Sequence, residues 1–181
     1  GELLNEKIDP LFSDHFEGVR DRLMFEILYQ TGIRSNELVN LKTKDIQNSA
    51  IKVLGKRNKE RIIPIDSGLV SLINHYASFR SELEFQTEFL VVLKSGKKLY
   101  PKLVYRKINS YLGMATGLRK KSPHVLRHTF ATHMLNNGAE LEVLKDILGH
   151  ANLSATQVYT HNSFAQLTSI YSQSHPRGHK K

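Results

Sequence analysis

From Ser122 the chain reads SPHVLRHTFATH, and this stretch predicts a helix that carries charged and titratable side chains on one face. Pro123 suits the first helical position, because its missing N–H would have no partner there, and Ser122 is a favoured N-cap. His124, Arg127 and His128 fall at i, i+3 and i+4, which brings their side chains together on the helix surface. The group indicates a candidate site.

Downstream, residues 146–161 read DILGHANLSATQVYTH and contain a helix end followed by a helix start. Gly149 suits a left-handed C-cap, because glycine adopts positive φ without strain. Ser154 and Gln157 have the spacing of a capping box, which predicts a new helix at Ser154. Tyr159 would then lie about a turn and a half into that helix.

A third segment, TGIRSNEL at residues 31–38, repeats this design near the start of the chain. Gly32 breaks the helical pattern and Arg34 follows it. The next helix carries Glu37 one turn away. A lone tyrosine such as Tyr159 is usually a packed aromatic residue, but its companions change this interpretation. Arginine binds phosphate through a planar fork of donors, histidine exchanges protons near neutral pH, and tyrosine is a nucleophile, so the set suits a phosphodiester.

The chain resembles the catalytic domain of the tyrosine recombinases, a phage-type integrase family, and is most similar to the Xer-type recombinases. The matching stretches occur in the family's order and lie at 31–38, 55–61 (GKRNKER), 122–133, 148–150 (LGH) and 154–161. Any one of them alone would be a weak signal, whereas five together are specific.

The resemblance implies six catalytic residues, which are Arg34, Lys56, His124, Arg127, His150 and Tyr159. The two arginines would clamp the scissile phosphate, and the tyrosine would attack it. His124 would act as acid or base, His150 would hydrogen-bond the phosphate, and Lys56 would protonate the departing 5′ oxygen. Glu37 would orient Arg34.

One position departs from the Xer pattern, because Arg57 stands where these proteins generally have a second glycine. If the turn needs a positive φ, Asn58 can adopt it in place of Arg57. The departure leaves Lys59 as an alternative to Lys56 for the catalytic lysine. The basic run at 56–61 could also be a solvated hairpin tip.

The hydrophobic pattern predicts a mostly α fold with a small antiparallel β-sheet (α+β), which is also the fold that the resemblance implies. Alternating or clustered apolar residues predict a hairpin from strands 51–54 and 61–65, with a third strand at 89–93. Helical spacing predicts a helix after Ile33 and further helices at about 17–29, 69–79, 100–114, 123–136, 141–148, 154–159 and 164–172.

The last predicted helix has an apolar face formed by Phe164, Leu167, Ile170 and Tyr171. This face could fold back on the protein's own core. The resemblance implies an alternative, in which the terminal segment docks into a neighbouring protomer of a recombinase tetramer on DNA.

Composition agrees with double-stranded DNA, the partner that the resemblance implies. The chain has 26 Lys and Arg against 17 Asp and Glu, a formal net charge of +9, which favours a polyanion. With no cysteine it can form neither a disulfide nor a thiolate zinc site. No apolar run is long enough to cross a bilayer, and we expect a cytoplasmic protein.

Neither a metal nor another cofactor is expected. His124, His128 and His133 could suggest zinc, but the chain lacks a His-Glu-x-x-His motif. We therefore predict that His128 and His133 are packed residues, with His128 supporting Arg127.

The predicted function is site-specific DNA recombination through a 3′-phosphotyrosyl intermediate. The alternatives are DNA relaxation like that of a type IB topoisomerase, and a DNA-binding module without catalysis. We expect the catalytic domain to span residues 1–174, with a disordered basic tail at 175–181 and the family's N-terminal DNA-clamping domain absent from this chain.

Overall fold

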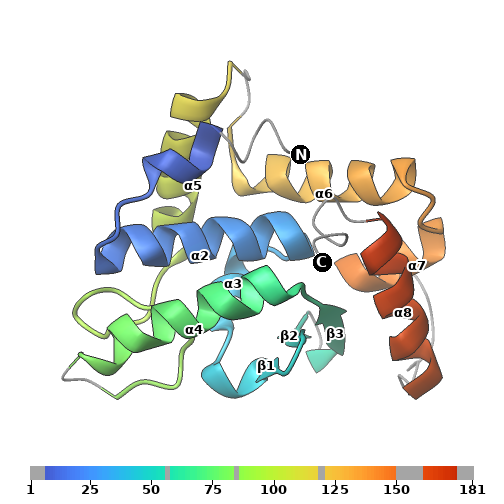
Figure 1. Ribbon diagram of the computed structural model, residues 1–181, viewed down its shortest axis with the longest axis horizontal. Coiled ribbons are helices and arrows are strands. Elements are labelled where there is room, and N and C mark those ends of the chain that lie inside the picture. Colours follow the sequence, from blue (N-terminus) through green and yellow to red (C-terminus); the bar gives the residue numbers. More distant parts are fainter. Residues whose placement is uncertain (1–6, 56–57, 84–85, 118–120, 150–160, 175–181) are drawn as a thin grey trace.

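The computed structural model describes residues 7–55, 58–83, 86–117, 121–149 and 161–174. The fold is mostly helical with a small antiparallel sheet, as the sequence predicts (Figure 1). None of the helices in the described segments has the length and apolar character that a membrane span requires. The elements in chain order are η1 (Asp9–Leu11), α2 (Phe16–Thr31), α3 (Ser35–Asn40), η2 (Thr43–Asp45), β1 (Ile46–Gln47), β2 (Ala50–Leu54), β3 (Glu60–Pro64), α4 (Ser67–Ser81), α5 (Pro101–Ala115), α6 (Pro123–Asn136), α7 (Leu141–Leu148) and α8 (His161–Ser174).

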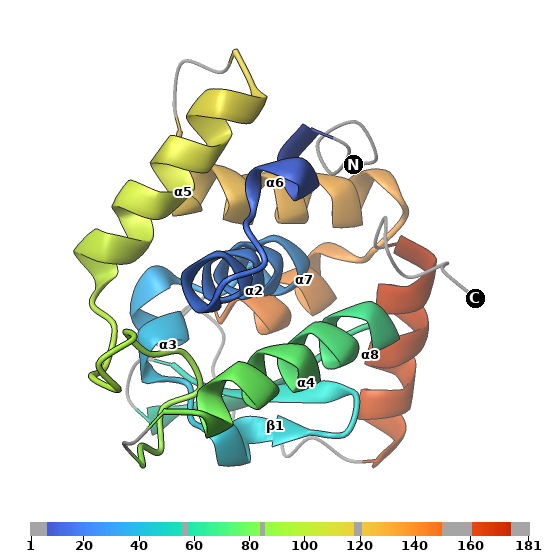
Figure 2. The ribbon, with the colours of Figure 1, turned by 60° about the vertical axis from the view of Figure 1, so that its left-hand side comes forward.

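Helix α2 forms the centre of the molecule. Figure 2 shows it nearly end-on, with other helices arranged around it, and it contacts α3, α4, α5 and α6. Almost all of its residues are buried, including Leu23, Met24, Phe25, Ile27 and Leu28, which have no exposed surface. A helix buried on all sides needs apolar residues around its whole circumference, which the sequence of α2 supplies.

Near its start, α2 also buries charged groups, which are paired. Asp21 accepts hydrogen bonds from Arg20 at 2.7 and 2.9 Å and from the Tyr111 hydroxyl of α5 at 3.0 Å, and Lys107 of α5 lies 2.9 Å from it. Burial raises the pKa of Tyr111 above its usual range, and the neighbouring Asp21 carboxylate adds to the effect. This network joins α5 to α2.

The sheet has the strand order β1-β2-β3, and both pairs are antiparallel. Strands β2 and β3 form the predicted hairpin, in which Val53 pairs with Arg61 and Leu54 with Glu60. In the turn, Asn58 has a φ of 56°, which confirms that this residue adopts the left-handed conformation.

The prediction of a third strand at 89–93 is wrong. The third strand of the sheet is β1, whereas Phe89 and Val92 form only isolated bridges, with Lys42 and Lys98. Leu90, Val91 and Val92 are nevertheless buried. A short apolar run predicts burial reliably, but it does not distinguish a strand from another buried extended segment.

The predicted helix boundaries hold at α6 and α7, which span 123–136 and 141–148. Pro123 begins α6, although Ser122 makes no capping hydrogen bond through its side chain. Gly149 ends α7 with a φ of 65°. The helix predicted at 154–159 lies outside the described residues.

The C-terminal helix α8 packs against its own chain. It contacts α6 and β3, and Leu167 and Tyr171 are buried. The Tyr171 hydroxyl donates to the backbone oxygen of Gln30 at 3.2 Å. These two residues of the predicted apolar face are therefore covered in cis, while the side chain of Phe164 lies outside the described part of the structure.

Candidate functional site

Arg34 lies where α2 gives way to α3. Gly32 ends α2 in the left-handed conformation with a φ of 63°, and a Cβ at this position would lie 2.6 Å from Phe130 of α6. Only glycine fits both the backbone conformation and this close approach. Arg34 then takes the N-cap position of α3 in an extended conformation, with 34% of its side chain exposed.

Glu37 binds Arg34 from the first turn of α3. Its carboxylate accepts the backbone N–H of Arg34 at 2.8 Å and the Arg34 guanidinium Nη1 at 3.3 Å. These contacts agree with the prediction that Glu37 orients Arg34. Because Glu37 satisfies a helix N-terminal N–H, the contact also fixes the start of α3.

Arg61 of β3 is the stronger partner of Glu37. Its Nη1 and Nη2 each lie 2.9 Å from a different carboxylate oxygen, which is a bidentate pair. Burial alone would raise the pKa of Glu37, but the hydrogen bonds and charges of Arg61 and Arg34 outweigh burial and lower it. Glu37 is therefore ionised at neutral pH.

Arg61 is not among the predicted site residues, and the sequence offers a solvated hairpin tip as one interpretation of its basic run. At Arg61 the solvated interpretation is wrong, since this residue is 4% exposed. Strand alternation is the signal that identifies it, because Arg61 and the buried Ile63 are two residues apart and so lie on the same face of β3.

Arg127 of α6 is held by the ends of two other helices. Its Nη1 donates to the backbone oxygen of Gly32 at 2.5 Å, and its Nη2 donates to that of Leu148 at 2.8 Å. Burial, together with the positive charges of Arg34 and Arg61, lowers the pKa of Arg127 to about 10, although Glu37 opposes the shift. The group remains protonated at neutral pH.

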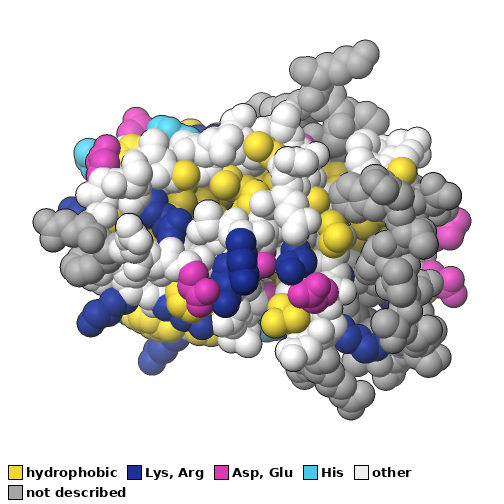
Figure 3. All heavy atoms as spheres, turned by 90° about the horizontal axis from the view of Figure 1, so that it is seen from below, with side chains coloured by type: hydrophobic (Ala, Val, Ile, Leu, Met, Phe, Trp, Pro, Cys, Tyr) yellow, Lys and Arg dark blue, Asp and Glu magenta, His cyan; other side chains and the backbone are white. Residues whose placement is uncertain are grey.

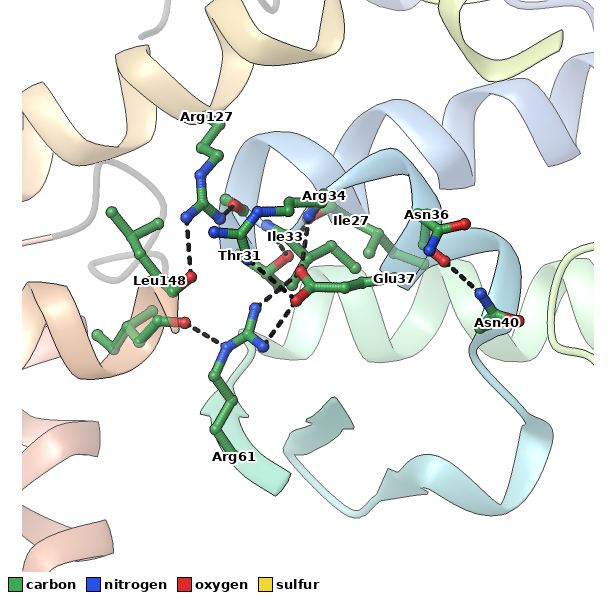
Figure 4. Close-up of polar contacts among 12 residues, drawn as sticks. Ile27, Thr31, Ile33, Arg34, Asn36, Glu37, Asn40, Arg61, Arg127 and Leu148 are labelled. Carbon is green, nitrogen blue, oxygen red and sulfur yellow. Dashed lines mark hydrogen bonds and ion pairs between the residues drawn. The ribbon is translucent and has the colours of Figure 1, made fainter. Parts of the chain in front are cut away.

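Figure 4 shows the guanidinium groups of Arg34, Arg61 and Arg127 gathered around the Glu37 carboxylate and the end of α7. We call these four residues the arginine cluster. They come from α3, β3 and α6, so the fold unites segments that are far apart in the sequence. The structure thus brings together two of the six predicted catalytic residues, Arg34 and Arg127.

The other predicted site residues are less completely described. His124 is exposed in the first turn of α6, one turn before Arg127. Lys59, the alternative lysine, is exposed beside the hairpin turn. Lys56, His150 and Tyr159 lie outside the described residues.

The two histidines predicted to be packed behave differently. His133 is partly buried, and its ring meets that of Tyr29 edge-on at 6.4 Å, as expected for a packed residue. His128 is exposed, so its prediction as a packed support for Arg127 is wrong. The carbonyls of Gly32 and Leu148 support Arg127 instead. Among the residues that the structure describes, no three His, Asp or Glu side chains gather in an arrangement that could hold a metal ion.

One face of the molecule carries a mixture of positive and negative side chains. Figure 3 shows Lys and Arg side chains interspersed with Asp and Glu on the face seen from below Figure 1. Surface pairs such as Lys42–Glu88 at 3.0 Å and Lys52–Glu60 at 3.2 Å also neutralise part of the charge.

A family model described as "Phage integrase family" matches residues 3–166 of the chain. The chain belongs to the phage integrase family. The match extends over the arginine cluster and over all six predicted catalytic residues.

Curated relatives in the family agree with this assignment. The chain is 40% identical to "Tyrosine recombinase XerC" of Staphylococcus saprophyticus over 183 residues, covering 99% of this chain and 62% of that protein. It is 41% identical to the protein of the same description from Chlorobaculum parvum, covering 89% of this chain and 51% of that protein. The chain thus spans about half to three-fifths of the length of these relatives.

Solved structures of the family have the same fold. An XerA recombinase superposes with a TM-score of 0.72 at 33% identity, covering 97% of this chain and 63% of that one. An XerH site-specific recombinase, described as a pre-cleavage complex with difH substrate, has a TM-score of 0.75 at 29% identity and covers 94% of this chain and 51% of that one.

Proposed function

We propose that this chain cleaves and rejoins DNA strands in site-specific recombination, with Tyr159 as the nucleophile. The observation that carries the proposal is the arginine cluster, in which Arg34 and Arg127 are held together as cations at the meeting point of three helix ends. Membership of the phage integrase family and the similarity to XerC and XerH recombinases support it. Neither alternative, DNA relaxation or binding without catalysis, is favoured by these relatives.

The cluster has the charge that a phosphoryl-transfer site requires. Three arginines against one glutamate leave two positive charges, since Glu37 neutralises one of them. Attack on a phosphodiester adds negative charge to the non-bridging oxygens, and donors already in place stabilise that charge without reorganisation. Arg34, with a third of its side chain exposed, would donate to one non-bridging oxygen and Arg127 to the other.

The proposed reaction exchanges one phosphodiester for another. The Tyr159 oxygen forms a bond to phosphorus as the bond from phosphorus to the 5′ oxygen breaks, which leaves a 3′-phosphotyrosyl linkage and a 5′-hydroxyl. His124 would accept the phenolic proton, and Lys56 would donate a proton to the departing oxygen. His150 would hydrogen-bond the phosphate. A 5′-hydroxyl from a partner strand reverses the step and completes the exchange.

The proposed partner is double-stranded DNA, on which recombinase protomers would assemble as a tetramer. The described part of α8 packs in cis, so we place any contact between protomers in residues other than Leu167 and Tyr171.

Covalent trapping tests the proposal. The chain is incubated with a pool of duplexes of randomised sequence, each nicked so that a short strand diffuses away after cleavage and rejoining cannot occur. We expect an adduct that survives denaturant and maps to Tyr159, and no adduct with Tyr159→Phe at unchanged DNA affinity. An adduct on another residue, or its persistence in Tyr159→Phe, would contradict the proposed nucleophile.

A further inference from the structure

Arg61 joins three parts of the site, although the proposed reaction gives it no contact with DNA. It belongs to β3, it binds Glu37 of α3 through both Nη atoms, and its Nε donates to the backbone oxygen of Ile147 in α7 at 2.6 Å. All three contacts are buried, and the charge of the guanidinium is matched by Glu37.

Two glycines border the Arg61 guanidinium. A Cβ at Gly149 would lie 3.1 to 3.4 Å from its Nη1, Cζ and Nε atoms, and a Cβ at Gly55 would lie 3.3 Å from Nη1. Gly55 precedes Lys56, and Gly149 precedes His150. The two glycines that directly precede these proposed catalytic residues therefore pack against Arg61.

Arg61 also links the hairpin to the other arginines of the cluster. Residue 61 lies two positions after Lys59, and the Gly55 N–H donates to the Lys59 oxygen at 2.8 Å, which closes the base of the turn. β3 contacts α7 and α8, but Arg61 supplies the bond from the turn side of β3 to Glu37, and Glu37 in turn binds Arg34. Side-chain hydrogen bonds thus run from the hairpin to the phosphate-binding arginine.

We propose that Arg61 is a positioning residue: it fixes the base of the hairpin, at Gly55 and Lys59, relative to Arg34, and thereby supports the lysine that protonates the departing 5′ oxygen. This inference rests on the proposed function. Its specific content is that loss of the Arg61 fork impairs protonation of the departing oxygen and leaves tyrosine attack much less affected.

A substrate with sulfur in place of the bridging 5′ oxygen separates these two steps, because a thiolate leaves without a proton. Arg61→Lys keeps the positive charge beside Glu37 but loses the bidentate fork. We expect it to slow cleavage of ordinary DNA by about 10- to 100-fold, the usual effect of a misplaced catalytic group. On the sulfur-containing DNA its cleavage rate should stay within about threefold of the wild-type rate. The alanine variant of the catalytic lysine, Lys56→Ala or Lys59→Ala, should be rescued in the same way.

Arg80→Lys is the matched control. Arg80 also binds through its guanidinium, but to Thr43 and Thr87, away from the cluster. It should cleave both DNAs at the wild-type rate. Arg61→Gln provides a second variant at the same position, because glutamine retains one donor for Glu37, and the thermal midpoint of each variant confirms that it is folded.

The outcomes are distinct. The proposal is overturned if each Arg61 variant is slowed as much on the sulfur-containing DNA as on ordinary DNA. A better leaving group does not relieve a general loss of structure or of phosphate binding. A wild type that forms no Tyr159 adduct on either DNA would contradict the proposed function itself.

Discussion

At the scale of single residues, the arginine cluster carries a net positive charge, because three arginines share one glutamate. Arg34, Arg61 and Arg127 surround one carboxylate. Burial is the main cause of the lowered pKa of Arg127, about 10, and repulsion from the other two arginines adds to it. An anion bound at the cluster relieves this repulsion. We therefore regard Glu37 as the residue that makes the group of cations compatible with a folded chain.

Replacing Glu37 tests this view. Glu37→Gln keeps the shape of the side chain but leaves the buried Arg61 without a counter-charge, so we expect a loss of about 3–5 kcal/mol in the free energy of unfolding at neutral pH. The pKa of Glu37 is lowered from 4.5 in the folded protein, so its contribution is complete above that value and is lost as pH falls through the folded pKa.

Urea unfolding at several pH values between about 7 and 3 measures both effects. The difference between wild type and Glu37→Gln should narrow on the acid side. Glu17→Gln is the control, because Glu17 is 63% exposed and its pair with Arg20 spans 3.7 Å. A difference between wild type and Glu37→Gln that is constant across this range would contradict the assigned role of the Glu37 charge.

The two arginines proposed to bind phosphate, Arg34 and Arg127, should differ in their contributions to stability. Arg127→Met removes the donors to the Gly32 and Leu148 oxygens and should lower the free energy of unfolding by about 1–3 kcal/mol. Arg34→Met removes one long contact from a partly exposed side chain and should lower it by less than about 1 kcal/mol.

Both variants should nevertheless slow cleavage, by about 10²–10³ each, because each removes a proposed donor to the phosphate. Denaturant unfolding and single-turnover adduct formation, measured on the same preparations, check the pair. Equal destabilisation by the two substitutions would show that the contacts of Arg127 with the helix ends are not important for folding.

At the scale of elements, the ends of helices locate the site. The cluster lies where α2 ends, α3 begins and α7 ends. In the last turn of α7, the backbone oxygen of Ile147 accepts from Arg61 and that of Leu148 accepts from Arg127. Those oxygens have no partner within their own helix, and cations are favoured at a helix C-terminus. The arginines thus stabilise the end of α7 while the end of α7 fixes the arginines.

Gly149 should be sensitive for two separable reasons. Gly149→Ala places a side chain at a φ of 65°, which costs about 1–3 kcal/mol, and also brings a Cβ to 3.1 Å from Arg61. Gly138→Ala has the same kind of backbone cost at a φ of 89°, with no atom within 4 Å of the new Cβ.

Both alanine variants should therefore be destabilised, but only Gly149→Ala should also slow adduct formation beyond what its unfolded fraction explains. Thermal unfolding and adduct rates on the same samples test this. Equal cleavage rates in the two folded variants would show that the approach of Gly149 to Arg61 has no catalytic consequence.

These elements also show what the sequence alone could predict. Pro123 and Gly149 mark boundaries through properties of their own backbones, so the limits of α6 and α7 could be read locally. Arg34 and Arg127 could be identified from motif context, but the pairing of Arg61 with Glu37 joins residues 24 apart in different elements. The prediction of a strand at 89–93 failed for the same reason, since whether an apolar run pairs as a strand depends on what lies beside it.

At the scale of the whole molecule, binding of DNA should be dominated by charge. The net charge of +9 implies several phosphate contacts, so the logarithm of the affinity should fall with the logarithm of salt concentration by about 0.9 for each phosphate contacted. Titration of a fluorescent duplex at several salt concentrations gives this slope. We also expect cleavage to persist in a chelator, since arginines supply the charge at the phosphate; loss of cleavage there would contradict this account.

The buried charges near the start of α2 have a consequence at its other end. Apolar side chains alone would let a central helix rotate or slide to several similar packings, whereas Asp21 can meet Tyr111 and Lys107 of α5 together in only one. Gly32 lies eleven residues further along, about 16 Å at the rise of an α-helix. The Asp21 network therefore sets the rotation of α2 about its axis. Because the Gly32 oxygen at the end of α2 accepts from Arg127, the network also sets where Arg127 is held.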